Sequence, residues 1–269
     1  MSALNLRDRD QQWRTELCPN GLNEEVEVPE GAIDEIGPNV NGRTAPAMLD
    51  KDTMFYSYAD FVSDVSASCI WRATAVGEFP YKEWTEDDEP VYCTTVDELL
   101  EDEAPFVIDP SAFYDAQGKP WITFGSHFSG IFLLELDENE TGRVKDGSEP
   151  VLLARGRWSD EADDLDIEEF SVIEAPYMHY NSDNGFYYLF VNWGTCCSGT
   201  DSTYNIRVGR SRRVTGPFLD KRGRNMLDRK GSIVLPRRPR KEPRINGPGH
   251  AGIVSIGNKE YFSFHFYDR

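Results

Sequence analysis

The sequence predicts an all-β fold whose sheets pack around a common axis, as in a β-propeller. Four segments share a proline, an extended stretch, a turn and a run rich in aromatic and β-branched residues, which is the composition of strands. The aligned prolines are Pro46, Pro110, Pro176 and Pro248. No segment carries a sustained apolar stripe at helical spacing. Units of about four strands, repeated with a period above roughly 40 residues, are the sequence signature of a propeller.

The elements of each unit follow in the same order. The strand that begins with the proline is followed by a turn with hairpin residues, at 50–52, 116–119, 182–185 and 257–258. A second strand comes next, and a third strand is predicted at 66–75, 130–137 and 204–211, before a fourth, edge strand. We therefore expect three full units and the inner hairpin of a fourth.

The chain is expected to divide at residue 44. Residues 1–43 show no comparable hairpin and are interpreted as an N-terminal segment of unclear structure, in which a first blade is degenerate or missing. Residues 44–269 form the propeller domain. The strands that would complete its last unit are not evident, so the predicted propeller is incomplete.

The charge of the chain limits its partners. The 269 residues carry a formal net charge of −19, which disfavours nucleic acid and anionic membranes and is compatible with a neutral polysaccharide. Residues 207–244 hold 14 of the 28 Lys and Arg residues. Because this stretch overlaps loop and outer-strand positions of the repeat, we interpret it as solvated. No apolar run approaches the roughly 20 residues that span a bilayer.

The cysteines leave the redox compartment open. Five cysteines are too few, and odd in number, for a disulfide scaffold. Cys196 and Cys197 are adjacent in the sequence, and we expect them not to bridge to each other. No CxxC or histidine-rich spacing indicates a metal site. The first residues contain no apolar region typical of a signal peptide.

Asp109 and Glu174 are the candidate catalytic carboxylates. Asp109 directly precedes the proline of one unit, and Glu174 lies two residues before the proline of the next. The first strand of each propeller blade lies nearest the axis, so both acids are expected at the mouth of an axial funnel. Glycosidic cleavage needs an acid that protonates the leaving oxygen, and a nearby carboxylate together with burial raises the pKa of such an acid. Taken singly, either acid could instead be a turn carboxylate bonded to backbone N–H groups.

At these residues the sequence resembles glycoside hydrolase family 43, and within it the arabinan endo-1,5-α-L-arabinosidases. The matching segments are residues 108–137, 174–218, 247–254 and 261–268, within a similarity that covers roughly residues 44–269. The resemblance implies a five-bladed β-propeller and an inverting mechanism. It also implies three carboxylates: a general base, an Asp that modulates a pKa, and a general acid.

The resemblance assigns roles residue by residue. Glu174 of the Glu-Ala-Pro-Tyr motif becomes the proton donor, and Asp109 of Ile-Asp-Pro becomes the modulator that also orients donor and substrate. His250 of Gly-Pro-Gly-His matches a histidine that in relatives binds an ion, often calcium, on the propeller axis; a structural hydrogen bond is the alternative role. The implied substrate-binding residues, from the Gly-Ser-x-x-Ser-Gly segment and the stretch before Asp109, are Phe106, Val107, Ile108, Ser126, His127 and Phe128.

The general base is not assigned by this resemblance. In the family it is an Asp in a His-Asp-Pro-like motif that opens the first blade, and this sequence has no such motif. Asp8 and Asp10 lie in a polar stretch without a following pair of strands, so neither is assigned to the role.

The expected function is hydrolysis of internal α-1,5-L-arabinofuranosidic bonds in plant arabinan or arabino-oligosaccharides. The resemblance implies an extracellular protein, and we expect a monomer. Two alternatives stay open. A chain without the general base would be a catalytically impaired arabinan-binding propeller or a truncated remnant. Another member of the family would act on xylosides or on terminal arabinofuranosides.

Overall fold

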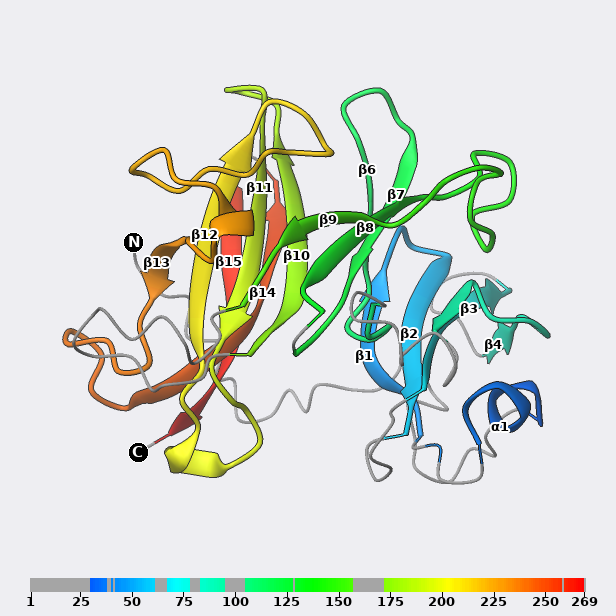
Figure 1. The fold of residues 1–269 in the computed structure, drawn as a ribbon, viewed down its shortest axis with the longest axis horizontal. Coiled ribbons are helices and arrows are strands. Elements are labelled where there is room, and N and C mark those ends of the chain that lie inside the picture. Colours follow the sequence, from blue (N-terminus) through cyan, green and yellow to red (C-terminus); the bar gives the residue numbers. More distant parts are fainter. Residues whose placement is uncertain are drawn as a thin grey trace.

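The structure is a computed structural model, and it describes residues 30–37, 40, 42–60, 67–77, 83–94, 105–127, 129–156, 172–257 and 259–268. These residues form four antiparallel sheets that follow one another along the chain, from blue to red in Figure 1. Strands β1 to β15 are accompanied by one short α-helix and by the 3-10 helices η2 (Gly199–Asp201) and η3 (Met226–Asp228). The all-β prediction is therefore confirmed for this part of the chain.

Each sheet is a meander whose strands keep the order of the chain, and we call the sheets blades 1 to 4. Blade 1 contains β1 (Thr44–Met48), β2 (Thr53–Ala59), β3 (Ser68–Val76), β4 (Glu83–Glu86) and β5 (Tyr92–Thr94), with β4 and β5 on different halves of β3. Blade 2 contains β6 (Ser111–Tyr114), β7 (Pro120–Phe124), β8 (Ile131–Glu135) and β9 (Val151–Ala154). Blade 3 contains β10 (Ile173–Asn181), β11 (Phe186–Trp193), β12 (Asn205–Ser211) and β13 (Ser232–Leu235), and blade 4 pairs β14 (Ile245–Ile256) with β15 (Lys259–Asp268).

The repeat predicted from the sequence is present in the structure. The predicted third strands are β3, β8 and β12, and the four predicted turns join the first and second strands of the four blades. The sequence did not predict the helix α1 (Glu30–Ile36), which lies beside blade 1 in Figure 1 and packs Ala32 and Ile36 into its core. No helix in the described ranges is long and apolar enough to cross a membrane.

Neighbouring blades pack face to face through alternating side chains. In β8, Ile131 and Leu133 join the core shared with blade 3, whereas Phe132 and Leu134 join the core shared with blade 1. This alternation follows from the two-residue period of a strand. Phe190 of β11 extends the same arrangement to blade 4. Blades 2 and 3 have a neighbouring blade on each face. Because both of their faces are covered, the sequences of their strands are continuous apolar runs.

One residue in the left-handed region lies near the start of the inner strand in blades 1 to 3 and near the middle of β14 in blade 4. These residues are Ala45 (φ 49°), Asp109 (φ 56°), Ala175 (φ 50°) and His250 (φ 49°). In β1, β10 and β14 a one-residue shift in strand register surrounds this residue, which is the mark of a β-bulge. A non-glycine residue in this region costs roughly 1–2 kcal/mol, so the bulges need stabilising contacts.

The bulges correct one part of the predicted repeat. In blades 1 to 3 the residue after the left-handed one is the predicted proline, but in blade 4 it is Ala251. The alignment of Pro248 with the other prolines is therefore wrong by three residues, because the backbone geometry follows the bulge and not the proline. As a consequence, His250 occupies in blade 4 the position that Asp109 occupies in blade 2.

Each left-handed residue in blades 2 to 4 is held by a side-chain oxygen of the preceding blade. The backbone N–H of Asp109 donates to Ser57 Oγ at 3.1 Å, and that of Ala175 donates to Asp109 Oδ2 at 3.1 Å. The backbone N–H of His250 donates to Asn192 Oδ1 at 2.9 Å. These three hydrogen bonds link the inner-strand segments of blades 2, 3 and 4 to the blade that precedes each of them.

Blade 2 supplies the accepting oxygen from a different position than blades 1 and 3 do. Ser57 and Asn192 lie at matched positions on the second strands of their blades, each opposite the residue before the bulge. The matched position in blade 2 is Gly125, which has no side chain and is paired through its N–H to the residue before Asp109. Asp109 therefore supplies with its own carboxylate the contact that Ser57 and Asn192 supply elsewhere.

Two disulfides are present among the described cysteines. Cys69 and Cys93 face each other across β3 and β5 and are bonded. Cys196 and Cys197 are also bonded to each other, so the expectation that they do not bridge is wrong. The backbone of Cys197 is left-handed (φ 64°). The N–H of Cys197 donates to Tyr267 Oη of blade 4 at 2.9 Å, which joins this loop of blade 3 to the next blade.

We predict that Asn192→Ala weakens the junction between blades 3 and 4. The buried Asn192 accepts from the His250 N–H and donates to the Pro248 carbonyl at 3.3 Å. Loss of both bonds should lower the free energy of unfolding by about 3 kcal/mol, measured by urea denaturation. Asn139→Ala, at an exposed turn position, is the matched control and should change it by less than about 0.5 kcal/mol. Equal effects of the two substitutions would contradict the prediction.

Candidate active site

Glu174 is a buried acid at the start of the inner strand of blade 3. Its side chain is 10% exposed, and its Oε2 accepts a hydrogen bond from Ser126 Oγ at 2.8 Å. Burial and, second, the charge of Asp109 raise the pKa of Glu174 to about 7, against the opposing effect of the Ser126 hydrogen bond. At neutral pH a large share of Glu174 therefore carries a proton that it can donate.

Asp109 comes from the adjacent blade and acts on Glu174 through its charge. Its Oδ2 accepts the N–H of Ala175, the residue that follows Glu174. Burial raises the pKa of the Asp109 carboxyl, while the imidazole of His250 and the Ala175 N–H oppose that rise. The structure thus places the two predicted carboxylates together, on neighbouring inner strands.

The segment between β7 and β8 fixes two polar side chains beside Glu174. It begins at Gly125 (φ 125°) and ends at Gly130 (φ 101°), and a Cβ on either glycine would overlap backbone atoms. Between them, Ser126 is fully buried and His127 forms an isolated β-bridge with Ile173. Ser126 Oγ lies 2.5 Å from His127 Nδ1, so one hydroxyl contacts both the acid and an imidazole.

The residues expected to bind substrate occupy different environments. Phe106 is half-buried and its ring lies 5.7 Å from the ring of His127. Val107 and Ile108 are buried, and Val107 belongs to the core between blades 1 and 2. Phe128 lies outside the described residues. The substrate-binding role of these residues and of Ser126 and His127 stays a prediction.

His250 lies close enough to influence two neighbours electrostatically. Burial and, second, the imidazole of His250 lower the pKa of His265, and the same imidazole opposes the rise in the pKa of Asp109. Ca²⁺ prefers six to eight oxygen ligands. Within the ranges that the structure describes, no group of three or more His, Cys, Asp or Glu side chains is arranged to hold a metal ion. The described side chains thus do not by themselves form a calcium cage, and the axial ion stays a prediction.

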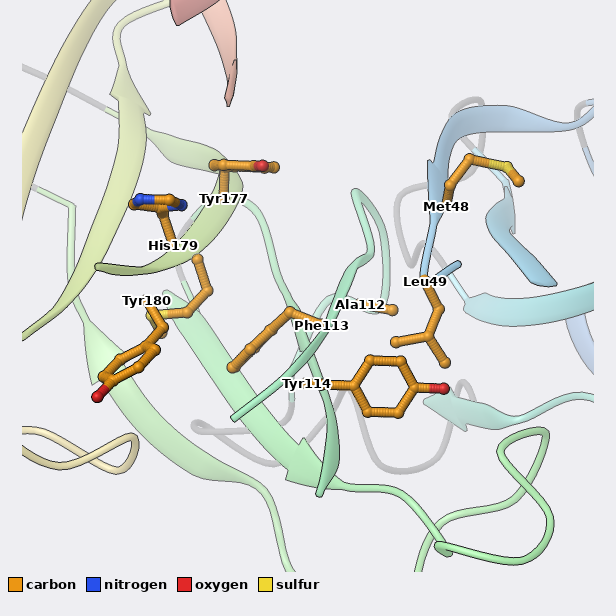
Figure 2. Close-up of a pocket in the computed structure, with 9 residues that line it drawn as sticks. Met48, Leu49, Ala112, Phe113, Tyr114, Tyr177, His179 and Tyr180 are labelled. Carbon is orange, nitrogen blue, oxygen red and sulfur yellow. The ribbon is translucent and has the colours of Figure 1, made fainter. Parts of the chain in front are cut away.

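A pocket of about 340 Å³ lies toward the opposite ends of the inner strands. It is bounded by the end of β1, by β6 and by the second half of β10, and Figure 2 shows aromatic and aliphatic side chains from all three around one space. Glu174 and Asp109 are not among its lining residues. This pocket is therefore distinct from the site at the starts of the strands.

The contacts of Glu174 with Ser126, and of Ala175 with Asp109, were not predicted from the sequence. The contact of Ala175 with Asp109 could in part have been predicted from the register of the repeat. This register places Ser57, Gly125 and Asn192 at matched positions of three blades. Blade 2 has a glycine, Gly125, where blades 1 and 3 have a hydrogen-bonding side chain. In blade 2 the hydrogen bond to the N–H of the next blade's left-handed residue is therefore made by Asp109.

Comparison with known proteins shows the family to which a chain with this site is similar. A family model described as glycosyl hydrolases family 43 matches residues 26–269. The extracellular endo-α-(1→5)-L-arabinanase 1 of Bacillus subtilis is 33% identical over 202 residues, covering 75% of this chain and 54% of that protein. The extracellular exo-α-(1→5)-L-arabinofuranosidase ArbA of Cellvibrio japonicus is 37% identical over 161 residues, covering 60% of this chain and 44% of that protein. The chain spans about half the length of these relatives.

Solved structures share the fold. A family 43 endo-arabinanase from Bacillus licheniformis is 31% identical with a TM-score of 0.69, covering 91% of this chain and 74% of that one. The α-L-arabinanase of Cellvibrio cellulosa complexed with arabinohexaose is 27% identical with a TM-score of 0.67, covering 96% of this chain and 74% of that one. These neighbours are five-bladed β-propellers, which confirms the predicted fold class.

The raised pKa of Glu174 predicts a pH-dependent stability. In the folded protein this pKa is about 7, against an ordinary 4.5, so between these values the folded state binds more protons than the unfolded state. The free energy of unfolding should therefore fall across this range as pH rises. Glu174→Gln removes the ionisation, and its stability relative to the unchanged protein should rise by about 3 kcal/mol between pH 4 and pH 8. A pH-independent difference in urea titrations would contradict the prediction.

Proposed function

The chain belongs to glycosyl hydrolases family 43, and from this premise we propose that it hydrolyses α-1,5-linked arabinan at internal bonds with inversion. The observation that carries the proposal is the buried Glu174, whose pKa of about 7 is maintained by burial and by the charge of Asp109. The arabinan substrate is inferred from relatives that are named for it and from the arabinanase solved with arabinohexaose.

In this proposal Glu174 is the general acid. The leaving sugar oxygen needs a proton as the glycosidic bond breaks, and a carboxyl whose pKa lies near neutral both holds and releases a proton under working conditions. Asp109 acts through its charge and through its bond to the Ala175 N–H, which fixes the backbone beside Glu174. Asp109 thus tunes the acid and positions it.

Inversion also requires a base that activates water on the opposite face of the sugar, roughly 6.5–9.5 Å from the acid. That residue is not assigned, and residues 1–29 lie outside the described part of the chain. Arabinan binding without turnover is therefore the second candidate, and it follows directly if no base is present.

We propose an extracellular location. The relatives are named extracellular, and disulfides such as Cys69–Cys93 persist in oxidising compartments. A net charge of −19 suits a neutral polysaccharide and disfavours polyanionic partners. The protein is proposed to act as a monomer.

The test of the function is arabinan hydrolysis by the unchanged protein and by Glu174→Gln. The unchanged protein should release reducing sugar from linear 1,5-arabinan, with oligosaccharides among the early products. The substitution should lower kcat by about 10²–10⁴-fold because it removes the transferable proton. Arabinose as the sole product would show that the protein cleaves from the chain end, and would contradict cleavage at internal bonds. Calorimetric binding of arabino-oligosaccharide with no turnover by folded protein would support the second candidate and overturn hydrolysis.

The charge of Asp109 predicts a shift in the pH profile. Asp109→Asn keeps an oxygen for the Ala175 N–H but removes the charge that raises the pKa of Glu174. The alkaline limb of kcat/KM should therefore move to lower pH, by about one pH unit. Asp183→Asn, in the exposed β10–β11 turn, removes a charge elsewhere on blade 3 and should leave the limb in place. A shift in the control, or none in Asp109→Asn, would argue against the assigned role.

A further inference from the structure

Ser126 connects the buried acid to a histidine that reaches solvent. Its Oγ lies 2.8 Å from Glu174 Oε2 and 2.5 Å from His127 Nδ1. Ser126 itself is fully buried. The side chain of His127 is 44% exposed, whereas that of Glu174 is 10% exposed, so the imidazole provides a polar route from solvent to the carboxyl. The acid and the imidazole are 3.9 Å apart and meet through the hydroxyl.

Because the Ser126 hydroxyl has a single proton, the hydrogen bonds from Glu174 to His127 must all run in one direction or all in the other. A serine hydroxyl donates one hydrogen bond at a time. When Glu174 is ionised, the hydroxyl donates to the carboxylate, so His127 must carry a proton on Nδ1 to donate to Oγ. When Glu174 is protonated, it donates to Oγ, the hydroxyl donates to Nδ1, and a neutral His127 carries its proton on Nε2. The protonation of Glu174 therefore sets the tautomer of His127.

From this geometry we propose that Ser126 and His127 form a relay that returns a proton to Glu174 after each bond cleavage. The inference rests on the proposed function, in which Glu174 gives its proton to the leaving sugar. Ser126 and His127 act here through Glu174 and are positioning residues in the relay.

The transfer balances as a shift of two protons. After cleavage Glu174 is a carboxylate, and His127 takes a proton from solvent and becomes an imidazolium. The Nδ1–H proton moves to Ser126 Oγ as the hydroxyl proton moves to Glu174 Oε2. One N–H bond and one O–H bond break, and two O–H bonds form. The products are a neutral Glu174 and a neutral His127 that holds its proton on Nε2, ready for the next cycle.

The surrounding charges fit a transient imidazolium. Burial lowers the pKa of His127, so the ring is largely neutral near pH 7, while the charge of Asp109 opposes that effect and stabilises the cation when it forms. Asp109 also faces Glu174, and the imidazole of His250 acts on Asp109 in turn. The ring of Phe106 covers one side of His127 in an edge contact.

The test is the tautomer of His127, followed by NMR with ¹⁵N-labelled histidine. The chain has four histidines, and the His127 signals are assigned by their loss in His127→Gly, a change that its left-handed backbone (φ 53°) accommodates. As pH rises through the titration of Glu174, neutral His127 should change from the Nε2–H to the Nδ1–H form. This change should vanish in Glu174→Gln and in Ser126→Ala, and it should persist in His179→Gln, which alters the histidine at the other end of β10.

Two results would overturn the relay. One is a His127 tautomer that does not change across the titration of Glu174. The other is a change that survives in Ser126→Ala, since the carboxylate would then act without the hydroxyl. Neither result depends on turnover, so the NMR readout is independent of the proposed hydrolysis.

Kinetics test the relay in catalysis. Ser126→Ala and His127→Gly should lower kcat about tenfold more on linear arabinan than on a 4-nitrophenyl arabino-oligosaccharide, whose leaving group departs without a proton. Added imidazole should restore activity to His127→Gly on arabinan. Equal losses on both substrates would indicate a structural role and overturn the relay in turnover. Inactivity of the unchanged protein together with the expected tautomer change would instead reject the proposed hydrolysis alone.

Discussion

The inner strands depend on one constraint, the left-handed residue that lies in or just before each of them. A non-glycine residue held in this conformation costs free energy, and in blades 2 to 4 its N–H is held by an oxygen of the preceding blade. The hydrogen bonds set the position of each blade relative to the one before it. The site is built on this device, because Asp109 is itself a bulge residue and Glu174 directly precedes the next.

This arrangement explains how a buried carboxylate, Glu174, and a half-buried one, Asp109, can lie together. Repulsion between them is offset on the side of Asp109 by the Ala175 N–H and the imidazole of His250. Glu174 receives the hydroxyl of Ser126. Burial raises the pKa of both acids, and the charge of Asp109 raises that of Glu174 further. The proposed roles of the two acids rest on these different neighbours.

Much of the fold could be predicted from the sequence because turns and β-rich runs are local signals. Residues 50–52, 116–119 and 182–185 carry their turn chemistry in their own side chains. The place of His250 could not be found this way, since Ala251 takes the position of the prolines in blade 4 and Pro248 lies three residues earlier. The bond between Cys196 and Cys197 depends on local backbone and side-chain geometry, which adjacency in sequence does not specify. Asp109 and Glu174 were found from the repeat, whereas the hydroxyl between Glu174 and His127 depends on tertiary packing.

Asp109 carries a consequence for how related sequences are interpreted. Its carboxylate replaces the contact that a side chain at Gly125 would make, so selection for a stable fold retains an acceptor at this position even where catalysis has been lost. Glu174 differs, because among the described residues its carboxylate accepts from the Ser126 hydroxyl and from no backbone N–H, so the bulge does not depend on it. Among homologues, retention of the glutamate is thus the more informative marker of an active enzyme, and retention of the aspartate alone marks little more than an intact propeller.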